Sequence, residues 1–278
     1  MKPKIGIMQG RLSDQIGNSV QYFPKSSWKQ EFKKAFELEF NSIEWIFDKT
    51  NNPLCNSYGR SEILETQKKY GIKINSICAD YFMKEKLFNE SETKLKKNIE
   101  ILKDLIMASA KLEIPLIEIP FVDSSSIKTP EEKNQLKNNL EKILPYAEQN
   151  NIDIALETDL IPNEFNDYLT QINHPRIFAN FDSGNSASLG YEPKKELKIL
   201  QKWIRNIHIK DRKYFGTTVP LGTGDTDFDS IFSILQEIDY HDDLIIQGSR
   251  IPEKTHSSYE TCFTYLRFVD GYVNKYYR

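Results

Sequence analysis

The feature that most constrains the fold is a repeating alternation, in which short apolar runs rich in β-branched residues are each followed by a stretch with helical spacing. Such alternation is typical of repeated βα units that build a parallel sheet. The runs expected to form strands are Lys4–Gln9, Ser42–Phe47, Lys73–Ala79, Ile114–Phe121, Ile152–Thr158, Ile177–Asp182, Arg205–Lys210 and Leu244–Gly248. Eight strands that each precede a helix, without a break in composition, predict a single α/β domain, a (β/α)8 TIM barrel over residues 1–278.

Two helical segments have clear boundaries in the sequence. In the first, Thr129 is the expected N-cap, Pro130 occupies the first helical position and Glu132 completes a capping box. Pro145 falls inside the same segment and is expected to kink it. The last helix is expected to begin at about Ser258. No GxGxxG motif follows any of the runs, which favours a barrel over an open dinucleotide-binding sheet.

Composition and charge exclude several classes of function. The chain has 37 Lys and Arg against 40 Asp and Glu, so its net charge of -3 does not favour binding to nucleic acid or to an anionic membrane. It has no run of about 18 apolar residues and no signal-peptide pattern at its start. The three cysteines have no close spacing, which argues against a disulfide framework and a thiolate metal site. We therefore expect a cytoplasmic enzyme.

Strand parity predicts which polar side chains face the inside of the barrel, because alternate residues of a barrel strand point inward. In Arg205–Lys210 the apolar Ile207 and Ile209 share one parity, so His208 and Lys210 take the inward one. The same rule turns further polar residues inward near the ends of four other runs: Glu118, Glu157, Asp182 and Gln247.

These inward polar residues lie at similar heights on neighbouring strands. Each alone has a plainer interpretation: Glu157 paired with a basic residue, His208 as a structural histidine, Asp182 as part of a turn. Together they form a set that would cost on the order of several kcal/mol to bury without partners. Two carboxylates, an imidazole and a carboxamide suit a divalent cation. The sequence therefore predicts one cation site formed by Glu157, Asp182, His208 and Gln247.

Four segments carry a resemblance to a known family: IALET with Glu157, ANFDSGN with Asp182, RNIHIKDR with His208, and the loop PLGTGDTDF at Pro220–Phe228. With these motifs in order along its whole length, the chain resembles the xylose-isomerase-like barrels, which include sugar-phosphate isomerases and epimerases. In family members such as the ketose 3-epimerases, a Glu, an Asp, a His and a second Glu bind one divalent metal. The resemblance implies that Glu157, Asp182 and His208 take the first three places, with Mn²⁺ as the expected ion and Mg²⁺, Co²⁺ or Zn²⁺ as alternatives.

The chain departs from the family pattern at two positions. Gln247, in LIIQGSR, stands where those epimerases have their second Glu, and Asn185 stands where a His is common. A glutamine offers a carbonyl oxygen to a metal but cannot act as a general base. A symmetrical relay of two glutamates is therefore not expected, and Asn185 becomes a candidate substrate ligand. Dimers are common in the family, which leaves a homodimer open.

The expected substrate is a small sugar that carries negative charge. The opening IGIMQGRLS and the NPL at Asn52–Leu54 resemble a subgroup associated with bacterial surface-polysaccharide and nonulosonate gene clusters, which implies an activated or acidic sugar. Arg11, Lys210, Arg212 and Arg250 also lie at or just past strand ends. Such a cationic rim suits a phosphate or a carboxylate.

The resemblance and the polar set together predict an isomerase or epimerase of the EC 5 class. Glu157 is the expected base, an enediolate the intermediate, and Lys210 or Glu118 the donor of the returning proton. A metal-dependent dehydratase or aldolase would use the same site. Gln247 and Asn185 also leave open a catalytically silent or regulatory sugar-binding barrel.

A nuclease of the endonuclease IV type is disfavoured, because its cluster of several zinc ions needs additional histidines. The chain has only His174, His208, His241 and His256. His174 and His241 each precede an expected strand, at the opposite end of the barrel from the predicted site.

Overall fold

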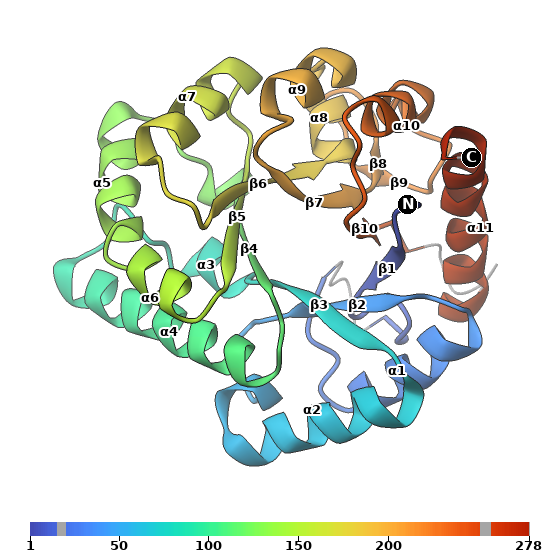
Figure 1. Cartoon of the computed structure of the whole chain (residues 1–278), viewed down its shortest axis with the longest axis horizontal. Helices are drawn as coiled ribbons and strands as arrows, with labels where there is room; N and C mark the ends of the chain where they lie inside the picture. The colour runs from blue at the N-terminus through green and yellow to red at the C-terminus, as the bar shows by residue number, and fades with distance from the viewer. Residues whose placement is uncertain (16–20, 251–256, 278) are drawn as a thin grey trace.

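The computed structural model of the chain describes residues 1–15, 21–250 and 257–277, and within them eight parallel strands close into a barrel (Figure 1). The order around the barrel is β1-β10-β7-β6-β5-β4-β3-β2. The strands are β1 (Ile5–Met8), β2 (Ser42–Ile46), β3 (Lys73–Cys78), β4 (Leu116–Phe121), β5 (Asp153–Thr158), β6 (Ile177–Asp182), β7 (Ile204–Ile209) and β10 (Leu244–Ile246). The expected α/β TIM barrel is confirmed.

Helices surround the barrel (Figure 1). They are α1 (Trp28–Glu37), α2 (Ser57–Tyr70), α3 (Tyr81–Lys84), α4 (Glu92–Lys111), α5 (Pro130–Leu140), α6 (Leu144–Gln149), α7 (Pro162–Ile172), α8 (Ser183–Leu189), α9 (Pro193–Leu200), α10 (Phe228–Glu237) and α11 (Ser258–Tyr276), with 3-10 turns η1 (Pro53–Cys55) and η2 (Asp123–Ser125). None of the helices in the described part of the chain has the length and apolar character needed to cross a membrane.

The expected strands agree with the observed ones to within two residues at their ends. The eighth ends at Ile246, so Gln247 lies just beyond its strand. A small antiparallel ladder that the sequence did not reveal joins β8 (Asp211–Arg212) to β9 (Thr218–Val219). This ladder fixes the backbone directly after Lys210, at the carboxyl end of β7.

The helix after β4 begins as predicted and ends earlier than predicted. The Thr129 side chain accepts from the Glu132 backbone, and the reciprocal half of the capping box is present. The expectation that Pro145 kinks one continuous helix is wrong, because α5 ends at Leu140 and α6 begins at Leu144. Proline lacks an N–H and its ring clashes with the carbonyl four residues earlier, whereas the first turn of a helix tolerates it. Pro145 therefore lies in the first turn of a new helix.

The barrel interior is polar where strand parity places polar side chains. Ile207 and Ile209 are fully buried in the hydrophobic core, while Glu44, Glu118 and His208 on the other parity are also fully buried. Because β2 and β7 are not neighbours in the barrel, the contact between Glu44 and His208 crosses its interior. The interior thus holds charged groups away from water.

The stability of the fold is expected to fall as the pH rises, because of Glu31. This residue lies on α1 and is almost fully buried, and one of its oxygens accepts from the Gly10 backbone N–H at 3.0 Å. Burial raises the pKa of Glu31 from its usual 4.5 to about 7. A raised carboxyl pKa stabilises the folded state fully below the unfolded value, and this contribution is lost as the pH rises through the folded value.

Replacement of Glu31 by Gln should therefore remove a pH-dependent loss of stability between about pH 4.5 and 7, on the order of 3 kcal/mol. The measurement is the free energy of unfolding in urea at pH 5 and pH 8. Glu37, exposed on the same helix, supplies the matched control, since Glu37→Gln should leave the pH dependence unchanged. Equal slopes for Glu31→Gln and the unmodified chain would contradict the assignment.

Candidate active site

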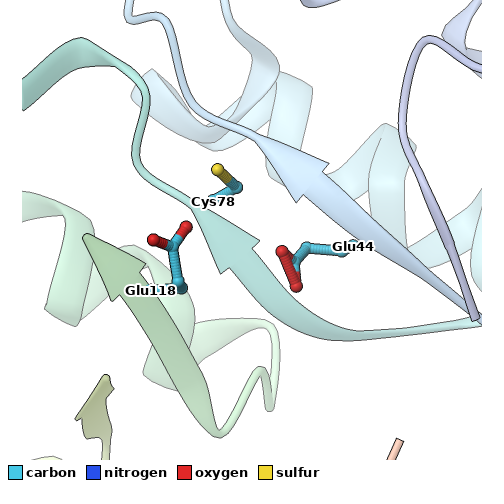
Figure 2. Close-up of side chains that lie close together, drawn as sticks. All are labelled: Glu44, Cys78 and Glu118. Atoms are coloured by element: carbon cyan, nitrogen blue, oxygen red, sulfur yellow. The ribbon is translucent and has the colours of Figure 1, made fainter. Parts of the chain in front are cut away.

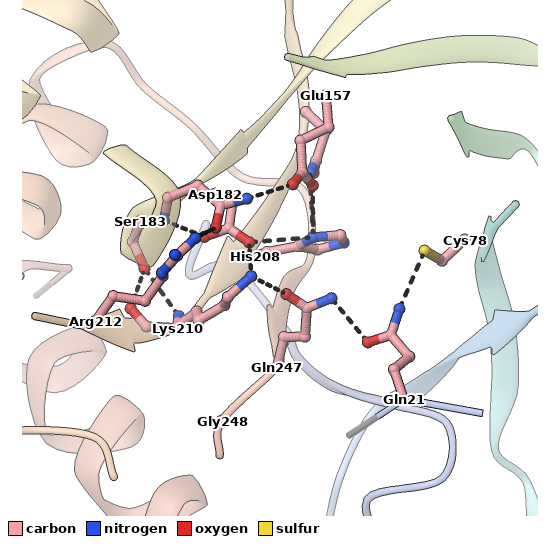
Figure 3. A network of polar contacts seen from close by, with 12 residues as sticks. Gln21, Cys78, Glu157, Asp182, Ser183, His208, Lys210, Arg212, Gln247 and Gly248 are labelled. Carbon is pink, nitrogen blue, oxygen red and sulfur yellow. Dashed lines mark hydrogen bonds and ion pairs between the residues drawn. The ribbon is translucent and has the colours of Figure 1, made fainter. Parts of the chain in front are cut away.

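The residues that the sequence singled out on β5, β6 and β7 lie together at the carboxyl ends of these strands (Figure 3). His208 Nδ1 lies 3.1 Å from Glu157 Oε2 and 3.9 Å from Asp182 Oδ2. Asp182 and His208 are also paired directly in the register of β6 and β7. One imidazole nitrogen and two carboxylates thus face a common point inside the mouth of the barrel.

Two side-chain amides fix the Glu157 carboxylate. Asn185 Nδ2 donates to Oε1 at 2.7 Å, and Asn180 Nδ2 donates to Oε2 at 2.5 Å. Asn185 itself is placed by Asp182, which caps α8 by accepting from the Asn185 backbone N–H at 2.8 Å. Its carbonyl oxygen accepts from Arg212 at 2.8 Å. Asn185, proposed from the sequence as a substrate ligand, is therefore a direct support of Glu157 in this structure.

Glu44 holds the His208 ring from the other side. His208 Nε2 lies 2.7 Å from Glu44 Oε1, and Asn206 Nδ2 donates to Glu44 Oε2 at 2.9 Å. Burial alone would lower the pKa of His208, but the charges of Glu44 and Glu157 and their hydrogen bonds outweigh it and hold this pKa well above its usual range. Because Glu44 engages Nε2, the other ring nitrogen, Nδ1, is the one turned toward Glu157.

Sequence reasoning missed several residues of this network, among them Glu44, Gln21 and Asp80. Glu44 could have been found, since Ile43 and Trp45 share one parity of β2 and leave Glu44 on the inward one. Gln21 and Asp80 follow β1 and β3 on irregular segments, where no periodicity marks them. Gln21 Nε2 donates to both Asp80 oxygens, at 3.0 and 2.9 Å.

Lys210 joins two of the predicted metal ligands. Its Nζ donates to Asp182 Oδ2 at 2.9 Å and to Gln247 Oε1 at 3.2 Å. The amide of Gln247 in turn donates to Gln21 Oε1 at 3.0 Å, which extends the network shown in Figure 3. Gly184 makes room for this lysine, because a Cβ at that position would lie 2.7 Å from Lys210 Cγ.

Glu118, the remaining predicted catalytic residue, lies deeper in the barrel. It is fully buried, and neither carboxylate oxygen has a hydrogen-bond partner among the described residues. Burial raises its pKa well above the usual range, and the nearby charge of Glu157 raises it further. Burial therefore favours the neutral form of the Glu118 carboxyl.

The arginines expected on the rim contact the protein's own backbone. Arg11 is only 6% exposed and donates through Nε to the Gly248 carbonyl at 2.9 Å. Arg250 donates to the Ser13 carbonyl at 2.8 Å and to the carbonyl of Gly10. These contacts fasten the segment after β1 to the segment after β10. The role of Arg11 and Arg250 as substrate ligands remains a prediction.

A donor set that fits one divalent cation contains two of the four predicted ligands, Glu157 and His208, and adds Glu118. Ligand atoms of Glu118, Glu157 and His208 lie within 4.8 Å of one another, close enough to share an ion with ligand distances of about 2.0–2.3 Å. The two carboxylate oxygens of Glu118 are buried and have no hydrogen-bond partner among the described residues. A bound ion would supply the missing partner. Lys210 already forms an ion pair with Asp182. The positive charge of a bound ion would therefore mainly balance the negative charge of Glu157.

The two other histidines in the described part of the chain do not extend this site. His174 and His241 lie just before β6 and β10, at the amino-terminal end of the barrel, and His256 lies outside the described residues. This placement agrees with the expectation that disfavoured a nuclease with several zinc ions.

A family model and several curated proteins are similar to this chain. The family model described as "Xylose isomerase-like TIM barrel" matches residues 32–257. The L-ribulose-5-phosphate 3-epimerase UlaE of Salmonella paratyphi C is 22% identical over 231 residues, which cover 79% of this chain and 81% of that protein. The inosose dehydratase of Clostridium tetani is 25% identical over 164 residues, 50% of this chain and 55% of that protein.

Among solved structures, that of the IOLI protein with a bound zinc atom superposes with a TM-score of 0.80 at 19% identity, over 98% of this chain and 99% of that one. It shares the closed eight-stranded fold. Since the family match spans most of the sequence, the chain belongs to the xylose isomerase-like TIM barrel family.

Proposed function

We propose that this protein is a metal-dependent isomerase or epimerase of a small sugar or sugar phosphate. The observation that carries the proposal is the convergence of Glu157, Asp182 and His208 Nδ1 at the mouth of the barrel, with Glu157 fixed by Asn180 and Asn185. The relationship to an L-ribulose-5-phosphate 3-epimerase supports the reaction class.

The proposed cation site consists of Glu157, Asp182 and His208, with the Gln247 carbonyl as a fourth donor, and Mn²⁺ is the expected ion. Support comes from the donor chemistry, since carboxylate oxygens and one imidazole suit Mn²⁺ and its neighbours among divalent metals. A neighbour with the same fold was solved with a bound zinc atom, which supports a divalent cation. When bound, such an ion polarises a carbonyl and an adjacent hydroxyl of the sugar.

The proton transfers belong to the side chains. Glu157 removes the proton from the carbon next to the sugar carbonyl, because its carboxylate is held in place by two amide donors and needs no reorganisation. An enediolate results. Lys210, whose Nζ contacts Asp182, and Glu118, whose pKa is raised by burial, are the candidate donors that return a proton to the substrate. Return to the other carbon gives isomerisation, and return to the opposite face gives epimerisation.

The substrate proposed for this site carries a phosphate or carboxylate. Arg212 and Lys210 are half-buried at the site. Arg11 and Arg250 are held by backbone carbonyls of the segments after β10 and β1. Arginine and lysine are the usual partners of such anions. The name of the related epimerase gives its substrate as a sugar 5-phosphate. A phosphorylated substrate would agree with the positive charge of these side chains.

A dehydratase is the second candidate, because an inosose dehydratase is also a relative. Removal of the same proton by Glu157 would lead to dehydration if the neighbouring hydroxyl group then left as water. In the isomerase or epimerase reaction, a proton returns to the enediolate instead. The two outcomes differ in product mass by one water.

The test measures solvent deuterium in the sugar. Metal-free protein is incubated in D₂O with L-ribulose 5-phosphate, ketoses and nucleotide sugars, with and without Mn²⁺, and products are followed by NMR and mass spectrometry. We expect Mn²⁺-dependent deuterium incorporation into one class of substrate without loss of water. Incorporation that is equally fast without any divalent ion would contradict the metal requirement. Binding of sugars without any exchange would instead favour a silent sugar-binding barrel.

A further inference from the structure

A second group of potential ligands lies beside the proposed cation site. Glu44, Cys78 and Glu118 project from the adjacent strands β2, β3 and β4 toward one another (Figure 2). Cys78 and Glu118 are direct register partners in the ladder between β3 and β4. One ligand atom from each of the three residues lies within 4.8 Å of the others. Two ligands on one ion at about 2.0–2.3 Å each span up to roughly this separation.

The carboxylates of this group have unused acceptor positions. An ionised carboxylate offers about four lone-pair positions. Three of those on Glu44 are taken by His208, Ser76 and Asn206, which leaves about one. None on Glu118 is used among the described residues, although this side chain is completely buried. A buried carboxylate without a partner is costly, and this cost points to a proton or a cation on Glu118.

Cys78 offers its sulfur to this group of ligands. Its thiol donates to Asp80 Oδ1 at 3.2 Å, and Gln21 Nε2 points at the sulfur from 3.7 Å. A cation that binds the sulfur displaces the thiol proton, and the Gln21 amide then remains as a donor to the sulfur.

We propose that Glu44, Cys78 and Glu118 form a second cation site, which takes a thiophilic divalent ion such as Zn²⁺. A sulfur ligand together with two carboxylates suits Zn²⁺ better than Mg²⁺ or Mn²⁺. Binding releases the Cys78 proton and the Glu118 proton to solvent. Glu118 also belongs to the donor set around Glu157 and His208, and Cys78 is the ligand that distinguishes the second site from that set. With an ion on Glu118, the returning proton of the proposed reaction comes from Lys210.

Cadmium is the probe, because a Cd²⁺–thiolate bond produces a charge-transfer absorption that carboxylates and imidazole do not produce. Metal-free full-length protein is titrated with Cd²⁺ while ultraviolet absorption is recorded and bound ions are counted by native mass spectrometry. We expect the thiolate band to appear with one equivalent. Cys78→Ser should abolish the band and lower the number of bound ions by one. Cys55→Ser, which removes the exposed thiol, should change neither.

Two further variants keep the test decisive if Cys78→Ser does not fold. Glu118→Gln should weaken the Cd²⁺ affinity read from the band by at least about tenfold, the lower end of losses seen when groups supporting a metal site are removed. Asp182→Asn should leave the band intact, since Asp182 belongs to the other set.

The second site would be disproved by the absence of a thiolate band at saturating Cd²⁺. A band that persists in Cys78→Ser, or one that Glu118→Gln leaves at full affinity, would disprove it equally. If the band behaves as expected but no second ion binds to the parent protein, the proposed function fails while this inference stands.

Discussion

Glu157→Gln is expected to slow deuterium exchange from solvent into the substrate by about 10²–10⁴-fold, the range that a positioned general base supplies. The amide of glutamine keeps the shape of the side chain, and its carbonyl still accepts from Asn185 or Asn180. It cannot take up the substrate proton. Exchange into the sugar, measured with Mn²⁺ bound, isolates this step from sugar binding.

Gln247→Glu provides the matched comparison. It adds one negative charge to the proposed cation site, whereas Glu157→Gln removes one. A carboxylate at 247 would lie next to the ammonium of Lys210 and should tighten divalent-cation binding while preserving some exchange. If Glu157→Gln retained full exchange with its metal bound, Glu157 would have no part in the proton transfer.

Glu44→Ala is expected to lower the free energy of unfolding by about 3–5 kcal/mol, the size found when one partner of a buried ion pair is removed. Glu44 and His208 are both completely inaccessible to solvent and lie 2.7 Å apart. Burial by itself would raise the pKa of Glu44, but the His208 charge and hydrogen bonds outweigh it, so its pKa is lowered. Alanine leaves the imidazolium without this counter-charge.

Ser76→Ala is the control for this effect. Ser76 donates a single hydrogen bond of 2.7 Å to the same carboxylate, so its removal should cost only about 1 kcal/mol. Urea unfolding of the metal-free proteins, followed by circular dichroism, compares the two. Similar losses in both variants would mean that the pair across the barrel contributes little to stability.

The barrel and the main cluster could be predicted from sequence because both depend on periodicity. Alternation by two residues placed His208 apart from Ile207 and Ile209, and the same rule located Glu157 and Asp182. Periodicity ends where the strands end, and for that reason Gln21 and Asp80 gave no signal. Pro145 shows a different limit: a proline in a helical pattern is compatible with a kink or with a new helix, and only the course of the backbone decides between them.

The roles of the predicted residues were harder to foresee than their positions. Asn185 and Arg212, predicted as ligands for a substrate, also form a chain of contacts that ends on Glu157. Arg11 lies past a strand end as expected, yet its guanidinium is buried against the loop after β10. Spacing along one strand cannot show which residue of another strand will satisfy a given donor, because that depends on packing around the whole barrel.

The fastening of the segment after β1 to the segment after β10 has a consequence for how the protein is made. Arg11 bonds to Gly248 and Arg250 to Ser13, contacts that each join residues 237 positions apart. While the chain leaves the ribosome, Glu157, Asp182 and His208 are available long before Gln247, and the first strand has no neighbour on one side until the last one arrives. Contacts of such long range form late. A nascent chain must therefore keep the edge of β1 from pairing with other chains until its synthesis is nearly complete.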